Sequence, residues 1–188
     1  MKKLLSIAVC ILLSCMLLAC GNTSEPAKAD KSPKTESKKS DDSKKLNTSE
    51  YKGLSFEIPS ESEYDAESDS SAIITFEPQK KIVTIIPTDT SSLNQDLSDS
   101  WNDLSITSIL DGFEEVQNRK DSETTLSGLP AKEVTCMVKL SGSWFSYNII
   151  AVVSEDYDYQ YSICYATSED AGTDNSAYES FIKSIGFK

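Results

Sequence analysis

Three consecutive strands predicted between Ala131 and Ala166 constrain the fold more than any other part of the chain. Apolar and polar residues alternate on both sides of Ser141-Gly142, and a two-residue turn flanked by alternating runs predicts a β-hairpin. The turn pairs Leu140 with Ser143 and places Val134 beside Ile149. Because side chains alternate between the two faces of a strand, this register sets which residues share a face.

A second turn, at Ser154-Glu155-Asp156, is predicted to continue the meander into a third strand. In the expected register Val153 lies beside Tyr157 and Ile149 beside Tyr161. The tyrosines of the third strand would then share one apolar face with Tyr147, as cross-strand aromatic pairs that stabilise a sheet. Lining a ligand cleft is the alternative role for these tyrosines.

The same register predicts the state of the two cysteines in this region. Cys136 and Cys164 fall on the outer two strands and on opposite faces, with roughly 10 Å between their strands. A disulfide needs Cα atoms within about 7 Å. We therefore expect two free, structural thiols.

Further strands are predicted on both sides of this meander. Leu54, Phe56 and Ile58 alternate with polar residues, and the runs 72–77 and 81–86 form a second hairpin that Pro87 ends. The polar stretch 113–126 is typical of one or two short edge strands.

Two helices are predicted to cover the sheet. The first begins at a capping box of Ser92 and Gln95 and ends near Leu104, and the last begins at Ser176 with Glu179 and stops at Gly186. Their apolar stripes are Leu93, Leu97, Trp101 and Leu104 in the first helix, and Tyr178, Phe181, Ile182 and Ile185 in the last. The expected fold class is α+β, an antiparallel sheet flanked by helices.

The first residues have the pattern of a cleavable export signal. Lys2-Lys3 precede an apolar run from Leu4 to Ala19, which is shorter than the roughly 20 residues of a membrane-spanning helix. The run ends in Leu17-Leu18-Ala19-Cys20, which resembles the lipobox of bacterial lipoproteins. The resemblance implies cleavage after Ala19 and lipid attachment to Cys20. An ordinary secretory signal, in which Cys20 is incidental, is the alternative.

The domain organisation follows from composition. Residues 1–19 are the predicted signal peptide, and residues 20–50 are the lipidated cysteine and a disordered tether rich in charged and small polar residues. Residues 51–188 form a single α+β domain. We expect the membrane, reached through lipid on Cys20, as the first partner. The expected location is the outer face of the cell membrane. The lysine-rich, cysteine-poor composition favours a Gram-positive bacterium.

Charge and residue content exclude several functions. Without residues 1–19 the chain has 16 basic and 30 acidic residues, a net charge of −14, which disfavours nucleic acid as a partner. The chain contains no histidine, so neither a Ser-His-Asp triad nor a histidine-containing zinc site is available. Ser49–Lys52 and Ser180–Lys183 have Ser-x-x-Lys spacing, at the frequency that chance predicts. We expect no enzyme and no cofactor.

An acidic run is the sharpest candidate for a metal site. Its carboxylates are spaced by two, and hard oxygen ligands suit Ca²⁺. Asp65, Glu67 and Asp69 are the candidate ligands, although Ser70 stands where an EF-hand loop requires glycine. A solvated loop between strands is the favoured alternative.

Three segments carry a family resemblance. They are Gly53–Pro59, the turn Leu126–Ala131 and the closing stretch Phe181–Ile185. Together with the meander they resemble the PsbP/Mog1-like domains, over about 51–188. The resemblance implies an α/β/α sandwich and a non-catalytic accessory or binding role.

The sequence is therefore compatible with two functions. The first is a membrane-anchored extracytoplasmic lipoprotein that binds a protein or envelope partner without doing chemistry. The second is a lipoprotein that binds a small ligand or Ca²⁺ for uptake or sensing.

Overall fold

The computed structural model describes residues 47–188, except 67–68, 77–79 and 96–97. The predicted signal peptide, Cys20 and the predicted tether up to residue 46 lie outside the described residues. Within the described ranges, no helix combines the length and the apolar character that crossing a bilayer requires.

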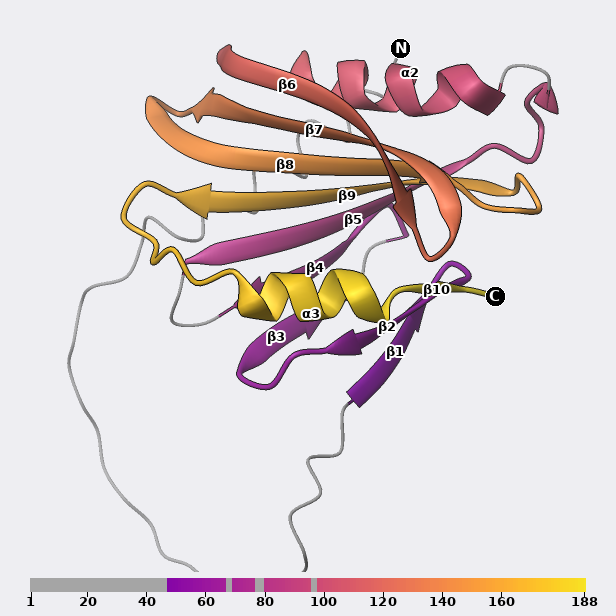
Figure 1. The fold of residues 1–188 in the computed structure, drawn as a ribbon, viewed down its shortest axis with the longest axis horizontal. Helices are drawn as coiled ribbons and strands as arrows, with labels where there is room; N and C mark the ends of the chain where they lie inside the picture. The colour runs from indigo at the N-terminus through magenta and orange to yellow at the C-terminus, as the bar shows by residue number, and fades with distance from the viewer. Residues whose placement is uncertain (1–46, 67–68, 77–79, 96–97) are drawn as a thin grey trace, which may run out of the picture.

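The described residues form two antiparallel sheets and two helices (Figure 1). The larger sheet has seven strands in the order β3-β4-β5-β9-β8-β7-β6, and the smaller has the order β1-β2-β10. The strands of the larger sheet are β3 (Ser62–Asp65), β4 (Ala72–Phe76), β5 (Lys81–Asp89), β6 (Glu115–Leu126), β7 (Leu129–Leu140), β8 (Ser143–Val153) and β9 (Tyr159–Ser168). Those of the smaller are β1 (Asn47–Tyr51), β2 (Leu54–Ile58) and β10 (Gly186–Phe187), and the helices are α2 (Ser98–Leu110) and α3 (Ser176–Ser184).

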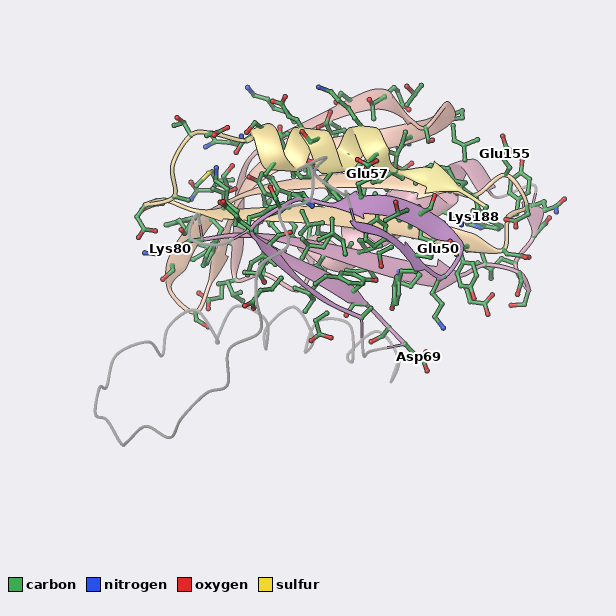
Figure 2. The ribbon with its side chains drawn as sticks, turned by 90° about the horizontal axis from the view of Figure 1, so that it is seen from below. Glu50, Glu57, Asp69, Lys80, Glu155 and Lys188 are labelled. Carbon is green, nitrogen blue, oxygen red and sulfur yellow. The ribbon has the colours of Figure 1, made fainter. Side chains whose placement is uncertain are left out.

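The domain begins earlier than its composition suggested. β1 pairs along its whole length with β2, so residues 47–50, which the sequence assigned to the tether, belong to the domain. Figure 2 shows Glu50 beside the C-terminal residue, and Lys188 Nζ donates a hydrogen bond to Glu50 Oε1. A polar strand at a sheet edge needs no apolar face of its own, which is why composition missed it.

The two helices cover opposite faces of the larger sheet, which lies between them in Figure 1. The face under α2 is packed with Ile106, Ile109 and side chains from β7, β8 and β9. The other face packs against Phe181 of α3 and against the smaller sheet, including Phe56. The expected α+β sandwich is confirmed.

The register of the first hairpin is as predicted, but that of the second is wrong by three residues. Leu140 pairs with Ser143 and Val134 with Ile149. In the second hairpin Val153 pairs with Gln160, because the connecting loop is longer than the turn expected at 154–156. Because side chains alternate between the two faces of a strand, a register shift by an odd number of residues moves every β9 side chain to the opposite face of the sheet from the one predicted.

This exchange changes the environment of the cysteines. Cys136 and Cys164 share the α2 face, not opposite faces, and both are buried. β8 still separates their strands, and both thiols are free as predicted.

The same exchange separates the tyrosines. Tyr161 and Tyr165 lie in the core on the α3 side, whereas Tyr147 lies on the α2 side. Tyr147, Tyr161 and Tyr165 are buried as expected, but Tyr157 is 37% exposed.

Other element boundaries also differ from expectation. β5 runs past Pro87 to Asp89, because β4 pairs only as far as Ile85 and β5 is an edge strand beyond it, where proline is tolerated. α2 begins at Ser98, not at the predicted capping box of Ser92 and Gln95, and continues past Leu104 to Leu110. Its buried residues include Trp101, Ile106 and Ile109, whereas Leu104 is exposed.

Three further predictions are corrected in part. The acidic loop after Pro59 contains a strand, β3, and the stretch 113–126 contains one long exposed edge strand, β6, with an irregularity between Gln117 and Lys120. α3 begins at Ser176 as expected, but its N-cap residue is Asn175 and no side chain caps it. The backbone N–H of Ser176 donates instead to Asp174 Oδ1.

Candidate binding groove under helix α2

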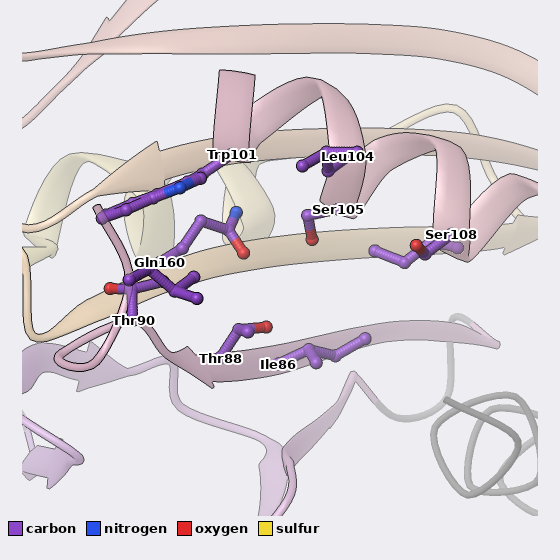
Figure 3. A pocket seen from close by; sticks show the side chains of 10 residues that line it. Ile86, Thr88, Thr90, Trp101, Leu104, Ser105, Ser108 and Gln160 are labelled. Carbon is purple, nitrogen blue, oxygen red and sulfur yellow. The ribbon is translucent and has the colours of Figure 1, made fainter. Parts of the chain in front are cut away.

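A cavity of about 190 Å³ lies between α2 and the sheet, where β5 and β9 run side by side (Figure 3). We call it the α2 groove. Its lining residues are Ile86, Thr88, Thr90, Leu93, Trp101, Leu104, Ser105, Ser108, Ile109 and Gln160. Most of its wall is therefore apolar or aliphatic, with a few hydroxyl groups and one amide.

Three departures from the expected fold create this groove. β5 continues beyond Pro87, which brings Thr88 beside Gln160 of β9. α2 continues beyond Leu104, so that Ser105 and Ile109 cover the sheet. The shifted register of β9 turns Gln160 toward α2.

The floor of the groove carries a small polar network. Ser105 of α2 and Ser162 of β9 share a hydrogen bond, with 2.6 Å between their Oγ atoms. Gln160 Nε2 donates to Ser162 Oγ at 3.1 Å and to the backbone oxygen of Tyr161 at 2.8 Å. The network fixes the orientation of the Gln160 amide. The backbone oxygen of Tyr161 can only accept a hydrogen bond, so the NH₂ end of the amide must face it.

The other end of this amide has no partner. Gln160 is 1% exposed, and its Oε1 is a buried acceptor without a hydrogen bond. Two other described side-chain atoms share this state, Tyr64 Oη and Asn102 Oδ1, and neither residue lines the α2 groove. Figure 3 shows the Gln160 oxygen directed into the space beside Ser105.

The rim of the groove is formed by exposed apolar side chains. Leu93 is 47% exposed and Leu104 is 64% exposed. Tyr157 packs edge-on against Trp101, with ring centroids 6.3 Å apart. Thr90 holds the loop of Tyr157 in place, since its Oγ1 donates to the backbone oxygen of Tyr157 at 2.6 Å.

The lining of the α2 groove is uncharged. None of its lining side chains is acidic, basic, a thiol or a phenol, so the wall offers no group for proton transfer near neutral pH. What it offers is apolar area, hydroxyl groups and one unpaired amide oxygen.

The metal candidates do not come together in the described part of the chain. Asp65 is exposed on β3, Asp69 forms an ion pair with Lys52 at 3.2 Å, and Glu67 lies outside the described residues. The described acidic and cysteine residues include no group of three that would hold a metal ion.

Burial raises the thiol pKa of both cysteines. Burial raises the pKa of the Cys164 thiol to about 12, against a smaller opposing effect of a hydrogen bond with Tyr147. Burial also raises the pKa of Cys136. Both thiols are therefore protonated and unreactive at neutral pH.

A second hollow of about 160 Å³ lies beside Lys132, between α2 and the β6–β7 edge. Lys132 Nζ already contacts Asp103 at 2.6 Å and lies 4.0 Å from Glu123. Its lining is largely polar and its charges are paired, so it is the weaker candidate.

By sequence, no protein-family model and no curated protein matches the chain. By structure, it is similar to a Bacteroides thetaiotaomicron protein with a TM-score of 0.52 at 9% identity, over 72% of this chain. The chain spans 45% of the length of that protein. Cyanobacterial PsbP (CyanoP) from Synechocystis has a TM-score of 0.50 at 12% identity, over 76% of this chain and 92% of that one.

The domain has a PsbP/Mog1-like fold. The yeast Ran-binding protein Mog1p, from Saccharomyces cerevisiae, is also similar, with a TM-score of 0.45 at 9% identity over 65% of this chain and 78% of its own. At such identities the likeness concerns the fold alone.

Sequence reasoning missed the role of Gln160. It stands with Ser162 at alternate positions between tyrosines, a pattern that predicts a wet face for both polar residues. Both are buried instead, at 1% and 0% exposed, because α2 covers that face. No local signal in β9 reveals a helix that comes from elsewhere in the chain.

Proposed function

We propose that this chain is a membrane-tethered, extracytoplasmic binding module that docks a protein partner of the cell envelope in the α2 groove and performs no catalysis itself. The lipobox-like Leu17-Leu18-Ala19-Cys20 supports the membrane attachment. The charged spacer that follows supports a domain held away from the membrane surface. The PsbP/Mog1-like fold is compatible with such an accessory role.

The exposed apolar rim carries the proposal. Four large hydrophobic side chains among the described residues are exposed, and three of them, Leu93, Leu104 and Tyr157, surround the α2 groove. Clustered exposed apolar residues mark interaction sites, whereas single ones do not. A cavity within such a cluster provides the pocket that a central anchor residue of a partner fills.

Charge indicates which kind of partner fits. From Tyr51 onward the chain has 9 basic and 24 acidic residues, a net charge of −15. Asp89 is exposed just beyond the groove, and Glu155, Asp156 and Asp158 are exposed in the loop of Tyr157. An apolar anchor surrounded by basic residues is therefore the complementary surface, and the opposite charges would speed association.

A photocrosslinking residue at Leu104 in living cells tests the proposal. The matched control places the same residue at Glu179, which is exposed on α3 on the other face of the domain. We expect one dominant protein adduct from position 104 and none from position 179. Equal adducts from both positions, or none from position 104, would contradict the proposal.

The anchor is tested separately. We expect the wild-type chain to partition with membranes and to incorporate labelled palmitate, and Cys20→Ser to do neither. The crosslink at position 104 should also weaken in Cys20→Ser, because anchoring raises the local concentration of the domain near an envelope partner. A Cys20→Ser chain that still carries the label would exclude Cys20 as the lipid attachment site.

A small ligand for uptake or sensing is the second candidate function. The unpaired Gln160 Oε1 favours it, because small-molecule sites are apolar cavities with a few polar groups that fix orientation. The exposed Leu93 and Leu104 favour the protein partner, since they extend beyond the cavity itself.

A further inference from the structure

The size of the α2 groove limits what can enter it. A cavity of about 190 Å³ is slightly larger than the roughly 150 Å³ apolar cavity that accommodates benzene. One aromatic side chain therefore fits, whereas a peptide backbone with several side chains does not. The walls made by Trp101, Ile86 and Ile109 offer an aromatic and aliphatic surface to such a ring.

The unpaired oxygen of Gln160 defines the second requirement. A buried acceptor without a hydrogen bond destabilises the protein, so its presence in a cavity needs an explanation. Because Gln160 Nε2 is already held by Tyr161 and Ser162, the amide cannot turn over to relieve this state. A hydrogen-bond donor on the occupant would satisfy Oε1.

The ring of Tyr157 is held at the rim of the groove. Tyr157 has a φ of 61°, in the left-handed region that bulky residues avoid. Here the hydrogen bond from Thr90 Oγ1 to the backbone oxygen of Tyr157 helps to hold the ring against Trp101 at the groove.

We propose that the α2 groove receives a tryptophan or tyrosine side chain of the protein partner, whose N–H or O–H donates a hydrogen bond to Gln160 Oε1. This inference rests on the proposed function and specifies its anchor residue. The lining residues are uncharged, so the inserted group is neutral, and the basic residues of the partner stay at the acidic rim. Tryptophan and tyrosine are also the residues that most often dominate binding energy at interfaces.

The test uses two pairs of side-chain mimics and the full chain carrying Cys20→Ser. 3-Methylindole and 4-methylphenol have the donor, and 1,3-dimethylindole and 4-methylanisole lack it. Binding is followed by the shift of the Trp101 indole N–H signal in two-dimensional NMR. We expect at least one donor probe to bind about tenfold more tightly than its methylated counterpart, a ratio set by one hydrogen bond to a buried acceptor.

The variant Gln160→Met separates the hydrogen bond from the bulk of the added methyl group. It has nearly the same volume, but its thioether is only a weak acceptor, so most of the preference for the donor probe should disappear. Ser108→Ala, at an exposed lining position, is the matched control and should keep the preference. Equal binding within both pairs by the unchanged groove, or a preference that persists in Gln160→Met, would overturn the inference.

The crosslinking experiment separates a failure of the proposed protein partner from a failure of the proposed aromatic anchor residue. A dominant adduct at position 104 together with probes that show no donor preference would leave the proposed function standing and overturn the anchor. A donor preference without any protein adduct would overturn the protein partner and assign the groove to a free aromatic molecule.

Discussion

The rings of Tyr165 and Tyr178 stack face to face, with centroids 3.9 Å apart and planes inclined by 3°. Tyr165 comes from β9 and Tyr178 from α3, so the stack joins the helix to the sheet. Each hydroxyl is also held, since Tyr165 donates to Asn175 Oδ1 and Tyr178 to Asn148 Oδ1, both at 2.9 Å. The position of α3 therefore depends on directional contacts as well as on burial of Phe181.

Two substitutions of Tyr178 separate the stack from the hydrogen bond. Tyr178→Ala should lower the free energy of unfolding by about 3 kcal/mol, as for other aromatic truncations. Tyr178→Phe keeps the ring and leaves Asn148 Oδ1 without this donor, so it should cost about 1 kcal/mol. Urea unfolding measures both values, and equal costs for the two variants would contradict a role for the stack.

Gly53 is expected to tolerate substitution less well than Gly128. Both residues have a positive φ, +86° and +89°, which costs an alanine roughly 1–2 kcal/mol. A Cβ on Gly53 would also lie 3.3 Å from Tyr161 Oη, whereas a Cβ on Gly128 meets nothing within 4 Å. Since Tyr161 Oη donates to the backbone oxygen of Lys52 at 2.5 Å, it cannot move freely.

Gly53→Ala should therefore destabilise the protein by about 1 kcal/mol more than Gly128→Ala. Thermal or urea unfolding of the two variants gives the comparison. If both variants lose the same unfolding free energy, the contact with Tyr161 does not contribute to the effect at Gly53.

The two buried thiols should resist alkylation. Cys136 is 6% exposed and Cys164 is 1% exposed, and burial raises the pKa of each. We expect iodoacetamide at neutral pH to leave both unmodified in the native chain and to modify both in urea, as read by peptide mass spectrometry. Rapid modification of Cys164 without denaturant would show that this face of the sheet opens.

Stability should fall as the solution becomes alkaline. The pKa of Cys164 is raised from 9.0 to about 12 and that of Tyr51 from 10.0 to about 12, in both cases chiefly by burial. Above the unfolded pKa the unfolded chain loses these protons while the folded chain retains them, so their stabilisation is complete below about pH 9 and is lost up to about pH 12.

Urea unfolding at pH about 8 and about 10.5 measures this loss. Cys164 alone should contribute about 2 kcal/mol to it, at 1.36 kcal/mol for each pH unit above its unfolded pKa. Cys164→Ala should show a smaller loss than the unchanged chain. An unfolding free energy that stays constant over this range would contradict the assignment.

The first hairpin of the meander illustrates what local sequence can determine. Ser141-Gly142 allows one tight turn, Ser141 and Gly142 both have positive φ there, and the alternation on both sides agrees with it. The last helix was also predictable from local residues, because the apolar stripe of Tyr178, Phe181 and Ile182 is long enough to predict α3.

The candidate site was beyond local reasoning. α2 buries Ile106 and Ile109 beside Trp101 and exposes Leu104, and Leu93 lies exposed before the helix begins, so only Trp101 of these predicted stripe residues is buried. The helix face is chosen by the sheet beneath it, whose shape depends on strands far away in the chain. The exposed leucines then become the rim of the groove.

The fold class, the β7–β8 register and the existence of α3 were predictable from local residues, whereas the free thiols were predicted correctly although the two cysteines share a face. Tertiary structure decided the register of β9, because Tyr161, Cys164 and Tyr165 are all buried and both faces of that strand are covered. Alternation of apolar and polar residues specifies a register only when one face is wet. With α2 on one face and α3 on the other, the loop at 154–158 set the pairing, and that pairing placed Gln160 in the groove.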